Sequence, residues 1–314
     1  MPRLLLPPAP ELAGIVRYFH LQWDGGGAMQ VPATPFMHLG ILLEGAGQMA
    51  FHGQPATDTP RSFVSGALSR PCAIRATPGS RFISALLRIG QAQRLFPPTC
   101  DAFTDQVWPL QELVGHAEEE KLHDSLQRCA TPQEQVRAMS GWLKRLAAKR
   151  EDQRGSILLL PPRQLFDDGK DLAKRSGLGV RQFERRFLAS YGLTLRDTRR
   201  MFRFINMMGI LIARPDARGQ LGWLAQECGY FDQAHMARDF KALSGMTPGD
   251  FLRDVHDPSR PEMSLMRYSQ TEQSLVLGAQ SSEVLLLSNP RAGPADSMSD
   301  QSRPHPLRHA APAP

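Results

Sequence analysis

Short apolar segments, separated by glycine and proline, make up the first third of the chain. Two of them are HLGILLEGAGQMAFHG at 38–53 and SRFISALLRIG at 80–90. Apolar runs of this length, bounded by turn-forming residues, are typical of strands in a small sandwich or barrel. We therefore expect a strand-rich domain over residues 1–108.

The pattern changes over residues 109–154, where stretches rich in Gln, Glu, Lys and Arg carry apolar residues at helical spacing. We expect two helices in this connector, followed by a polar hinge at 151–156. One face of the second helix collects the apolar residues Val136, Met139, Leu143 and Leu146. After about residue 254 the chain is rich in Pro, Ser, Arg and Gln, which predicts a mostly disordered tail over 255–314, with at most a short element at EVLLLSN.

An internal repeat lies between the connector and the tail. DLAKRSGLGVRQFERRFLASYGLT at 171–194 aligns with LAQECGYFDQAHMARDFKALSGMTP at 224–248. In each copy a glycine, Gly177 or Gly229, stands five residues after the leucine of a Leu-Ala pair. Further on, each copy has two apolar residues spaced by four, then a glycine, an apolar residue and a threonine. Since glycine ends a helix readily, each copy predicts a helix, a tight turn and a second helix.

The second helix of each copy is expected to have one buried and one exposed face. Phe183 and Phe187 would be buried in the first copy, and Met236, Phe240 and Leu243 in the second. The exposed faces would then carry Arg181, Glu184 and Arg185 in one copy and Ala234, Ala237, Arg238 and Lys241 in the other, with Gln233 and His235 in the first turn. Small and hydrogen-bonding residues beside an arginine suit a helix that enters a DNA groove and reaches bases and phosphates.

Helix caps and one long helix complete this predicted unit. Asp232 can cap the second helix of the second copy, and Thr194 and Thr247 can cap the helices that follow each copy. Between the copies, MFRFINMMGILIAR has the apolar spacing of a single helix. Roughly 18 residues at about 1.5 Å each give a rod of about 27 Å, able to hold two helices in successive major grooves about 34 Å apart.

Charge supports a polyanionic partner for the repeat. The chain has 37 Lys and Arg against 31 Asp and Glu, a net charge of +6. Residues 161–254 alone hold 16 Lys and Arg against 11 Asp and Glu, so most of the excess lies in this segment. A local basic excess favours nucleic acid as a partner.

On these motifs, residues 161–254 resemble the DNA-binding domain of AraC/XylS-type bacterial transcription regulators, which have two helix-turn-helix units joined by a linker helix. The best match is LAQECGYFDQAHMARDFKALSGMTPGDF. Carried over by position, the resemblance implies base-reading roles for Arg181, Glu184, Arg185, Gln233, Ala234, Ala237 and Arg238, with His235 and Lys241 beside them at DNA. Arg203 and Phe204 match the start of the family's linker helix, whereas Gly179, Thr198 and Gly209 depart from its usual residues.

The resemblance also implies an organisation. VRYFHLQW at 16–23 and the strand-rich stretch after it resemble the small cupin-like sensor domains of such regulators. The expected fold is α+β, with a cupin-like β-barrel at 1–108, a helical connector at 109–154, an all-α double helix-turn-helix domain at 155–254 and the tail. The implied partners are double-stranded promoter DNA, RNA polymerase, a small-molecule effector and a second copy of the chain. No enzyme activity and no cofactor are expected.

Other interpretations remain open from the sequence. His38, Glu44 and His52 could form a metal site, which would favour a metal-dependent cupin enzyme with a helical scaffold, although the HxH pair usual in cupins is missing. Trp23, Trp108 and Phe63 could line a small-molecule pocket, but core positions are more common for such aromatics. A non-specific nucleic-acid or scaffold protein is the other alternative.

Cysteine usage and hydropathy indicate the compartment. Cys72, Cys100, Cys129 and Cys228 are scattered without a CxxC pair, so we expect reduced thiols. No apolar run approaches the roughly 20 residues that span a bilayer. The expected location is the cytoplasm, away from the membrane.

Overall fold

The computed structural model describes residues 2–51, 54–151 and 157–277. Its N-terminal part is an antiparallel sheet with the order β1-β2-β7-β3-β6-β8, and β4 also pairs with β7 while β5 pairs with β4. The strands are β1 (Arg3–Leu6), β2 (Val16–Val31), β3 (His38–Glu44), β4 (Gly47–Phe51), β5 (Thr57–Asp58), β6 (Ser62–Ser65), β7 (Cys72–Leu87) and β8 (Val107–Pro109). The long strands β2 and β7 pair along most of their length, with register shifts near Gly25 that bend the sheet. The strand-rich N-terminal domain is confirmed, and its curved antiparallel sheet agrees with the expected cupin-like barrel.

One face of this sheet packs on the connector helices. Because side chains alternate along a strand, Leu39, Ile41, Ile83 and Ala85 all point to the same side, and all are buried. They share one apolar cluster with Leu122, Leu126, Met139, Trp142 and Leu143 of the helices above them. The connector is therefore part of the N-terminal core.

The described part of the connector contains three helices, whereas two were expected from the sequence. They are α2 (Leu110–Val114), α3 (His116–Gln127) and α4 (Pro132–Ala148), after the short α1 (Cys100–Phe103). Gly115 has a φ of 86°, a conformation that ends α2 and starts α3 one residue later. Thr131 and Glu134 form a capping box at the start of α4.

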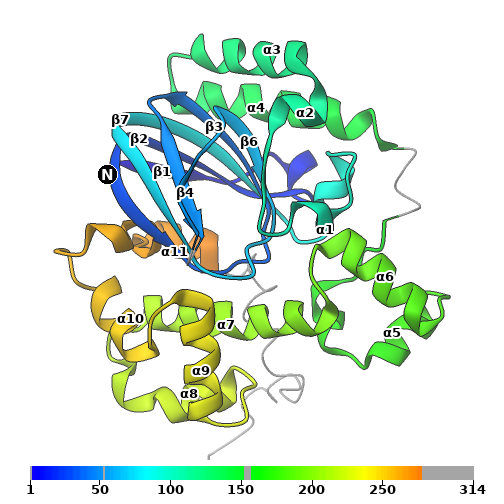
Figure 1. Ribbon diagram of the computed structural model, residues 1–314, viewed down its shortest axis with the longest axis vertical. Coiled ribbons are helices and arrows are strands. Elements are labelled where there is room, and N and C mark those ends of the chain that lie inside the picture. Colours follow the sequence, from blue (N-terminus) through cyan, green and yellow to red (C-terminus); the bar gives the residue numbers. More distant parts are fainter. Residues whose placement is uncertain (1, 52–53, 152–156, 278–314) are drawn as a thin grey trace, which may run out of the picture.

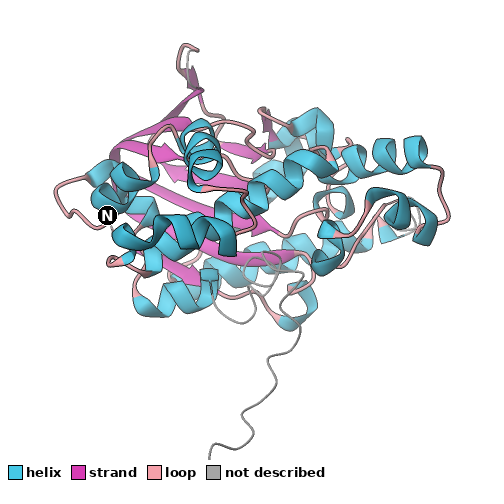
Figure 2. Ribbon diagram, turned by 90° about the horizontal axis from the view of Figure 1, so that it is seen from below, coloured by secondary structure: helices cyan, strands magenta, loops and turns pink. Residues whose placement is uncertain are grey.

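The other face of the sheet lies over the C-terminal helices. These are α5 (Gly169–Arg175), α6 (Val180–Tyr191), α7 (Leu195–Ala213), α8 (Leu221–Glu227), α9 (Gln233–Ser244) and α10 (Pro248–Val255). The long helix α7 runs beneath the sheet, with α5 and α6 at one end and α8 to α10 at the other (Figure 1). Seen from below, helices lie across the strands (Figure 2).

Sheet and helices share a second apolar cluster. Phe36 and Leu86 of the N-terminal part belong to it together with Phe187, Phe202 and Phe204. The Phe36 and Phe202 rings meet edge to face at 6.4 Å. The backbone N–H of Ala33 also donates to the carbonyl of Leu243 at 2.7 Å. The N-terminal part and the C-terminal helices are therefore packed into one body.

The first part of the predicted tail is folded. A 3-10 helix, η6 (Pro261–Met266), and helix α11 (Gln270–Leu277) follow α10 and return to the sheet. Their apolar residues Met263 and Met266 are buried, which the Pro- and Ser-rich composition did not indicate. The part of the predicted tail up to residue 277 is therefore folded, whereas 278–314, including EVLLLSN, lie outside the described residues. Among the described residues, no helix is long and apolar enough to span a bilayer.

Candidate DNA-binding helices and a cavity beside the linker helix

The first repeat copy folds as helix, turn and helix. The Asp168 carboxylate accepts hydrogen bonds from the backbone of Lys170 and Asp171 and so caps α5. Gly177 has a φ of 65°, which lets the chain turn sharply into α6. Phe183 and Phe187 are fully buried on one face of α6, as their spacing of four predicts. The predicted unit is confirmed.

The second copy repeats this geometry. Gly229 has a φ of 77° at the turn, and Asp232 caps α9 by accepting from the backbone N–H of His235 at 2.6 Å. On the buried face, the Phe240 ring packs edge to face on Phe204 at 5.0 Å and on Phe251 at 5.3 Å. These contacts hold α9 between α7 and α10, so packing in the core determines which face of α9 is exposed.

The capping threonines lie where the sequence placed them. Thr194 begins α7 by accepting from the N–H of Asp197 at 3.1 Å, and Thr247 begins α10 by accepting from the N–H of Asp250 at 3.2 Å. In both pairs the threonine hydroxyl also donates to the aspartate carboxylate. The two copies therefore match in the cap of the helix that follows each of them, as well as in their turns.

The predicted DNA-contacting residues occupy the outer faces of α6 and α9. Those that are exposed are Arg181, Glu184, Arg185, Gln233, Ala234, Arg238 and Lys241, and those that are half-buried are His235 and Ala237. Four of the exposed residues are cationic, as a phosphate-facing surface requires. Their contact with DNA stays a prediction.

His235 has a partner within the fold. Its ring packs edge to face on Tyr230 at 5.3 Å, and its Nε2 lies 3.7 Å from the carboxylate of Asp239. The same Asp239 carboxylate accepts from Nε of Arg200 on α7 at 2.9 Å. This ion pair between Arg200 and Asp239 joins α9 to the linker helix, and no local pattern in the sequence indicates it because its partners are 39 residues apart.

Two exposed aromatic side chains of the second unit were also missed. Trp223 on α8 is 55% exposed, and Phe231 in the turn before α9 is 86% exposed. Their sequence positions, at the outer face of a short helix and in a polar turn, could have indicated this. Single exposed aromatics are common at protein surfaces, and we assign them no role.

A cavity of about 280 Å³ lies between the sheet and α7. The sheet contributes alternating residues of its helix-facing side, including Tyr18, His20, His38, Phe63, Phe82 and Ser84. Helix α7 contributes Ile205, Met208, Gly209 and Ile212. The stacked rings of Phe63 and Phe82 lie 6.1 Å apart in this lining, next to Gly40, where a Cβ atom would meet the Phe63 ring at 2.5 Å.

The polar groups in the cavity wall are neutral or cationic. Burial lowers the pKa of His20 and of His38 to about 4, so both imidazoles are neutral at pH 7. Burial also raises the pKa of Tyr18 well above its usual range. The charged lining residues are Arg3 and Arg17, and the described lining contains no Asp or Glu. Such a cavity suits a mainly apolar molecule that is neutral or anionic and disfavours a cation.

The aromatics proposed for a pocket divide between this cavity and the core. Phe63 lines the cavity, whereas Trp23 and Trp108 pack against the cluster under the connector helices. Of the residues considered for a metal, His38 is buried in the cavity wall and Glu44 pairs with Arg81 at 2.5 Å, while His52 lies outside the described residues. Within the described part of the chain, no three His, Cys, Asp or Glu side chains are grouped so as to hold a metal ion.

The described cysteines are all unpaired. Cys72, Cys100 and Cys228 are buried, and burial raises the pKa of each thiol to about 12. Cys129 is partly exposed and is also free. Reduced thiols, expected from the scattered spacing, are what the structure contains.

Comparison with solved structures gives weak overall likenesses. ToxT from Vibrio cholerae is 9% identical with a TM-score of 0.40, over 75% of this chain and 98% of ToxT. A structure of ToxT with bound unsaturated fatty acid is 10% identical with a TM-score of 0.39, over 74% of this chain and 94% of that one. The AraC-like transcriptional activator CuxR is 12% identical with a TM-score of 0.23, over 77% and 82%. At these scores we draw nothing about ligands from the likenesses.

The repeat itself has a family match. The profile of a helix-turn-helix domain family matches residues 172–254, from within α5 to within α10. No curated protein matches the chain. The matched range holds both capped units, the linker helix and the exposed cationic faces described above. Residues 172–254 of the chain are thus a helix-turn-helix domain of this family.

Proposed function

We propose that this chain is an AraC-type transcription regulator that reads a specific promoter sequence with α6 and α9 and responds to a small molecule held between its sheet and α7. The observation that carries the proposal is the attachment of two capped helix-turn-helix units to the ends of one helix, with cationic side chains left exposed on both. Base contacts are assigned to Arg181, Glu184 and Arg185 on α6 and to Gln233, Ala234, Ala237 and Arg238 on α9. Lys241 is assigned to a phosphate, and His235, at the start of α9, to a phosphate or a base.

The division of the chain follows from this proposal. Residues 1–108 would hold the effector, and the connector at 109–154 belongs with them because its helices share their core. Residues 155–254 would bind DNA. The proposed activity is binding, without a catalytic step, in the cytoplasm, where a bacterial promoter is found. RNA polymerase and a second copy of the chain are further proposed partners.

Selection from random DNA with the full-length chain tests sequence specificity. The expected result is a motif of two half-sites about 10 bp apart, because each recognition helix enters one major groove. If the bound DNA molecules share no sequence motif, the result would instead support the non-specific alternative and refute the proposal.

Three single variants divide the contacts by role. Arg238→Ala is expected to relax base preference at one position, at a cost of about 1 to 3 kcal/mol if the guanidinium contacts guanine with two hydrogen bonds. Lys241→Ala is expected to weaken binding to all sequences alike and to lower the salt slope by about one. Lys174→Ala, an exposed lysine on α5 outside the assigned faces, is the control and should leave both quantities unchanged.

The effector site is tested by filling the cavity. Ser84 is buried on β7 and lines the cavity, so Ser84→Leu puts a larger apolar side chain into it. The probe is 1-anilinonaphthalene-8-sulfonate, which is apolar and anionic. Wild type is expected to bind it and Ser84→Leu to bind it at least tenfold more weakly. Ser125→Leu, at an exposed position of α3, is the control. Equal binding by Ser84→Leu and wild type would remove the cavity from the proposal.

A further inference from the structure

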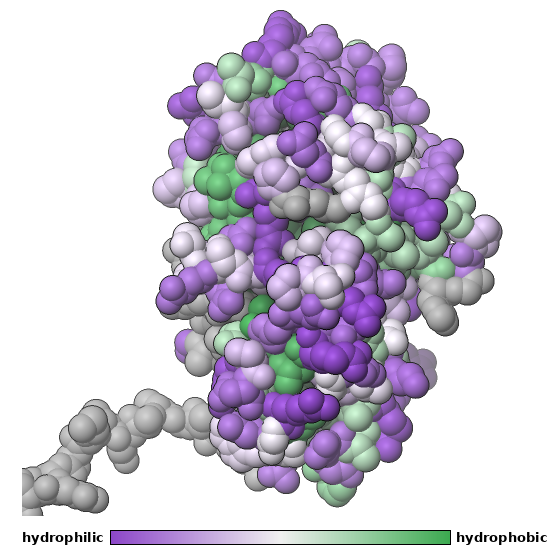
Figure 3. Space-filling view, turned by 90° about the vertical axis from the view of Figure 1, so that its left-hand side faces the viewer, coloured by the Kyte–Doolittle hydropathy of each residue, from purple (hydrophilic) through white to green (hydrophobic). Residues whose placement is uncertain are grey.

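The segment that follows α10, residues 256–277, connects the DNA-binding domain back to the first strand. We call it the C-terminal strap; it contains η6 and α11. In Figure 1 it runs from the end of α10 to the edge of the sheet that carries β1. This side of the molecule is mainly hydrophilic, with small separate hydrophobic patches (Figure 3). Nothing in the family match, which ends at 254, accounts for the strap.

Arg3 on β1 directs its whole guanidinium group at the strap. It donates to the carbonyls of Ser264 at 2.9 Å, Leu265 at 3.1 Å and Arg267. It also forms two hydrogen bonds with the carboxylate of Glu272, at 2.8 and 3.2 Å. The side chains of Arg3 and Glu272 are only 13% and 17% exposed, so solvent screens this pair weakly. We call this set of contacts the Arg3 clamp.

Further contacts place the strap over the cavity. Arg17, which is buried, lies over the Phe36 ring at 4.6 Å and donates to the carbonyl of Val276 in α11 at 2.7 Å. The guanidinium of Arg3 also lies 5.0 Å from the centre of the Tyr268 ring. The strap residues that line the cavity are Leu265, Met266, Tyr268 and Val276. The strap therefore supplies a cavity wall that neither the sheet nor α7 provides.

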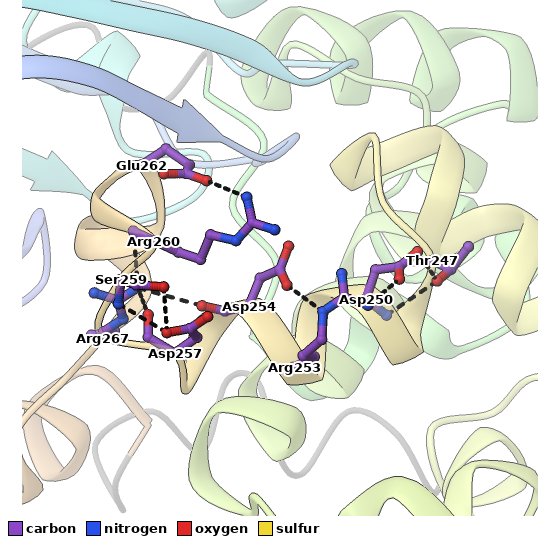
Figure 4. Close-up of polar contacts among 9 residues, drawn as sticks. All are labelled: Thr247, Asp250, Arg253, Asp254, Asp257, Ser259, Arg260, Glu262 and Arg267. Atoms are coloured by element: carbon purple, nitrogen blue, oxygen red, sulfur yellow. Dashed lines mark hydrogen bonds and ion pairs between the residues drawn. The ribbon is translucent and has the colours of Figure 1, made fainter.

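At its other end the strap is joined to the second helix-turn-helix unit. Arg267 reaches back and donates to the carbonyl of Val255, the last residue of α10, at 2.9 Å, and to those of Asp257 and Arg260. Figure 4 shows Arg267 turned toward Asp257, close to Asp254 at the end of α10. His256 Nε2 lies 3.0 Å from the carbonyl of Leu211 on α7. A displacement of the strap would therefore alter its hydrogen-bond contacts with α10 and α7.

We propose that the C-terminal strap is a functional wall of the ligand site, held closed by the Arg3 clamp, and that it couples occupancy of the cavity to the second DNA-binding unit. This inference rests on the proposed effector site. The strap residues that face the ligand would be Leu265, Met266, Tyr268 and Val276, which suit an apolar body. Arg3 also lines the cavity, and in this proposal its hydrogen bonds position the strap.

The clamp is tested with Arg3→Met in the full-length chain. Methionine keeps an apolar stem but removes every hydrogen bond to the strap. Amide hydrogen exchange over residues 261–277 is expected to rise at least about tenfold, since one charge-assisted bond alone accounts for about that factor. Arg81→Met is the matched control, because Arg81 pairs with Glu44 on the same sheet but is 38% exposed and does not line the cavity. Unchanged exchange in the strap of Arg3→Met would overturn the proposal.

Coupling is measured with the same variants, using 1-anilinonaphthalene-8-sulfonate as the probe and the selected DNA. In wild type, saturating probe is expected to change the Kd for DNA by at least about threefold. In Arg3→Met, probe binding should weaken at least about tenfold, and the Kd for DNA should no longer respond to the probe. A wild-type Kd for DNA that the bound probe leaves unchanged would overturn the coupling.

The outcomes separate this inference from the proposed function. If wild type fails to bind the probe, or Ser84→Leu binds it as wild type does, the effector site is wrong and the strap loses its role with it. If wild type binds the probe, Ser84→Leu does not, and Arg3→Met still behaves as wild type, the effector site stands and the strap proposal alone is refuted.

Discussion

The ion pair between Arg200 on α7 and Asp239 on α9 is expected to hold the second recognition helix in its orientation. Nε of Arg200 donates to the Asp239 carboxylate at 2.9 Å, and the two side chains are 35% and 14% exposed. A hydrogen bond to a charged group contributes about 1.5 to 3 kcal/mol, whereas an exposed ion pair contributes roughly 0 to 1 kcal/mol. Because the aspartate is mostly buried and the arginine is partly solvated, we expect a coupling of about 1 to 2 kcal/mol.

A double-mutant cycle measures this coupling. The variants are Arg200→Ala, Asp239→Ala and the double substitution, each unfolded in urea, so that the cycle isolates the pair from other effects. Asp124 on α3 and Arg128, the residue after α3, form the control pair, since they are 4.0 Å apart and 62% and 77% exposed. Their coupling should be close to zero.

The same cycle read by DNA binding connects the pair to function. If the ion pair orients α9, each single substitution should weaken binding to the selected DNA by about 5- to 30-fold, which corresponds to the expected 1 to 2 kcal/mol. A coupling for Arg200 and Asp239 no larger than that of the control pair would refute the reasoning, as would full DNA affinity in Asp239→Ala.

Three further predictions concern the caps, the turn and the cavity. Thr247→Ala should lower the free energy of unfolding by about 1 kcal/mol and Thr247→Ser should restore most of it, both measured by urea unfolding. Gly229→Ala should lower the free energy of unfolding by about 1 kcal/mol, because φ at this position is 77°. Gly249→Ala should cause no such loss, because nothing lies within 4 Å of the added methyl group. The melting temperatures of the two variants measure the difference. His20 and His38 have pKa values lowered to about 4 in the folded protein, whereas an unfolded histidine has a pKa of about 6.5. Between these two pH values the histidines take up protons in the unfolded chain but not in the folded one, so stability should fall as the pH drops from about 6.5 to about 4. Replacing both by Gln should flatten this part of the profile of urea midpoint against pH, and an unchanged profile would contradict it.

The sequence by itself determined the local design of the DNA-binding domain. The positions of Gly177 and Gly229, the capping role of Thr194 and the buried stripe of α9 all depend on residues within a few positions of one another. Backbone conformation, capping and helical periodicity act over that range, so they can be read along the chain. The exposed faces of α6 and α9 followed from the same periodicity.

Only the tertiary structure decided how these parts are joined. The Arg3 clamp spans 269 residues between Arg3 and Glu272, and nothing near Arg3 in the sequence indicates its partner. The connector's place in the N-terminal core, the folded strap and the cavity likewise depend on which apolar faces meet. Those contacts are selected by the burial of surfaces that are distant in the chain, and burial depends on the whole packed body rather than on any local spacing.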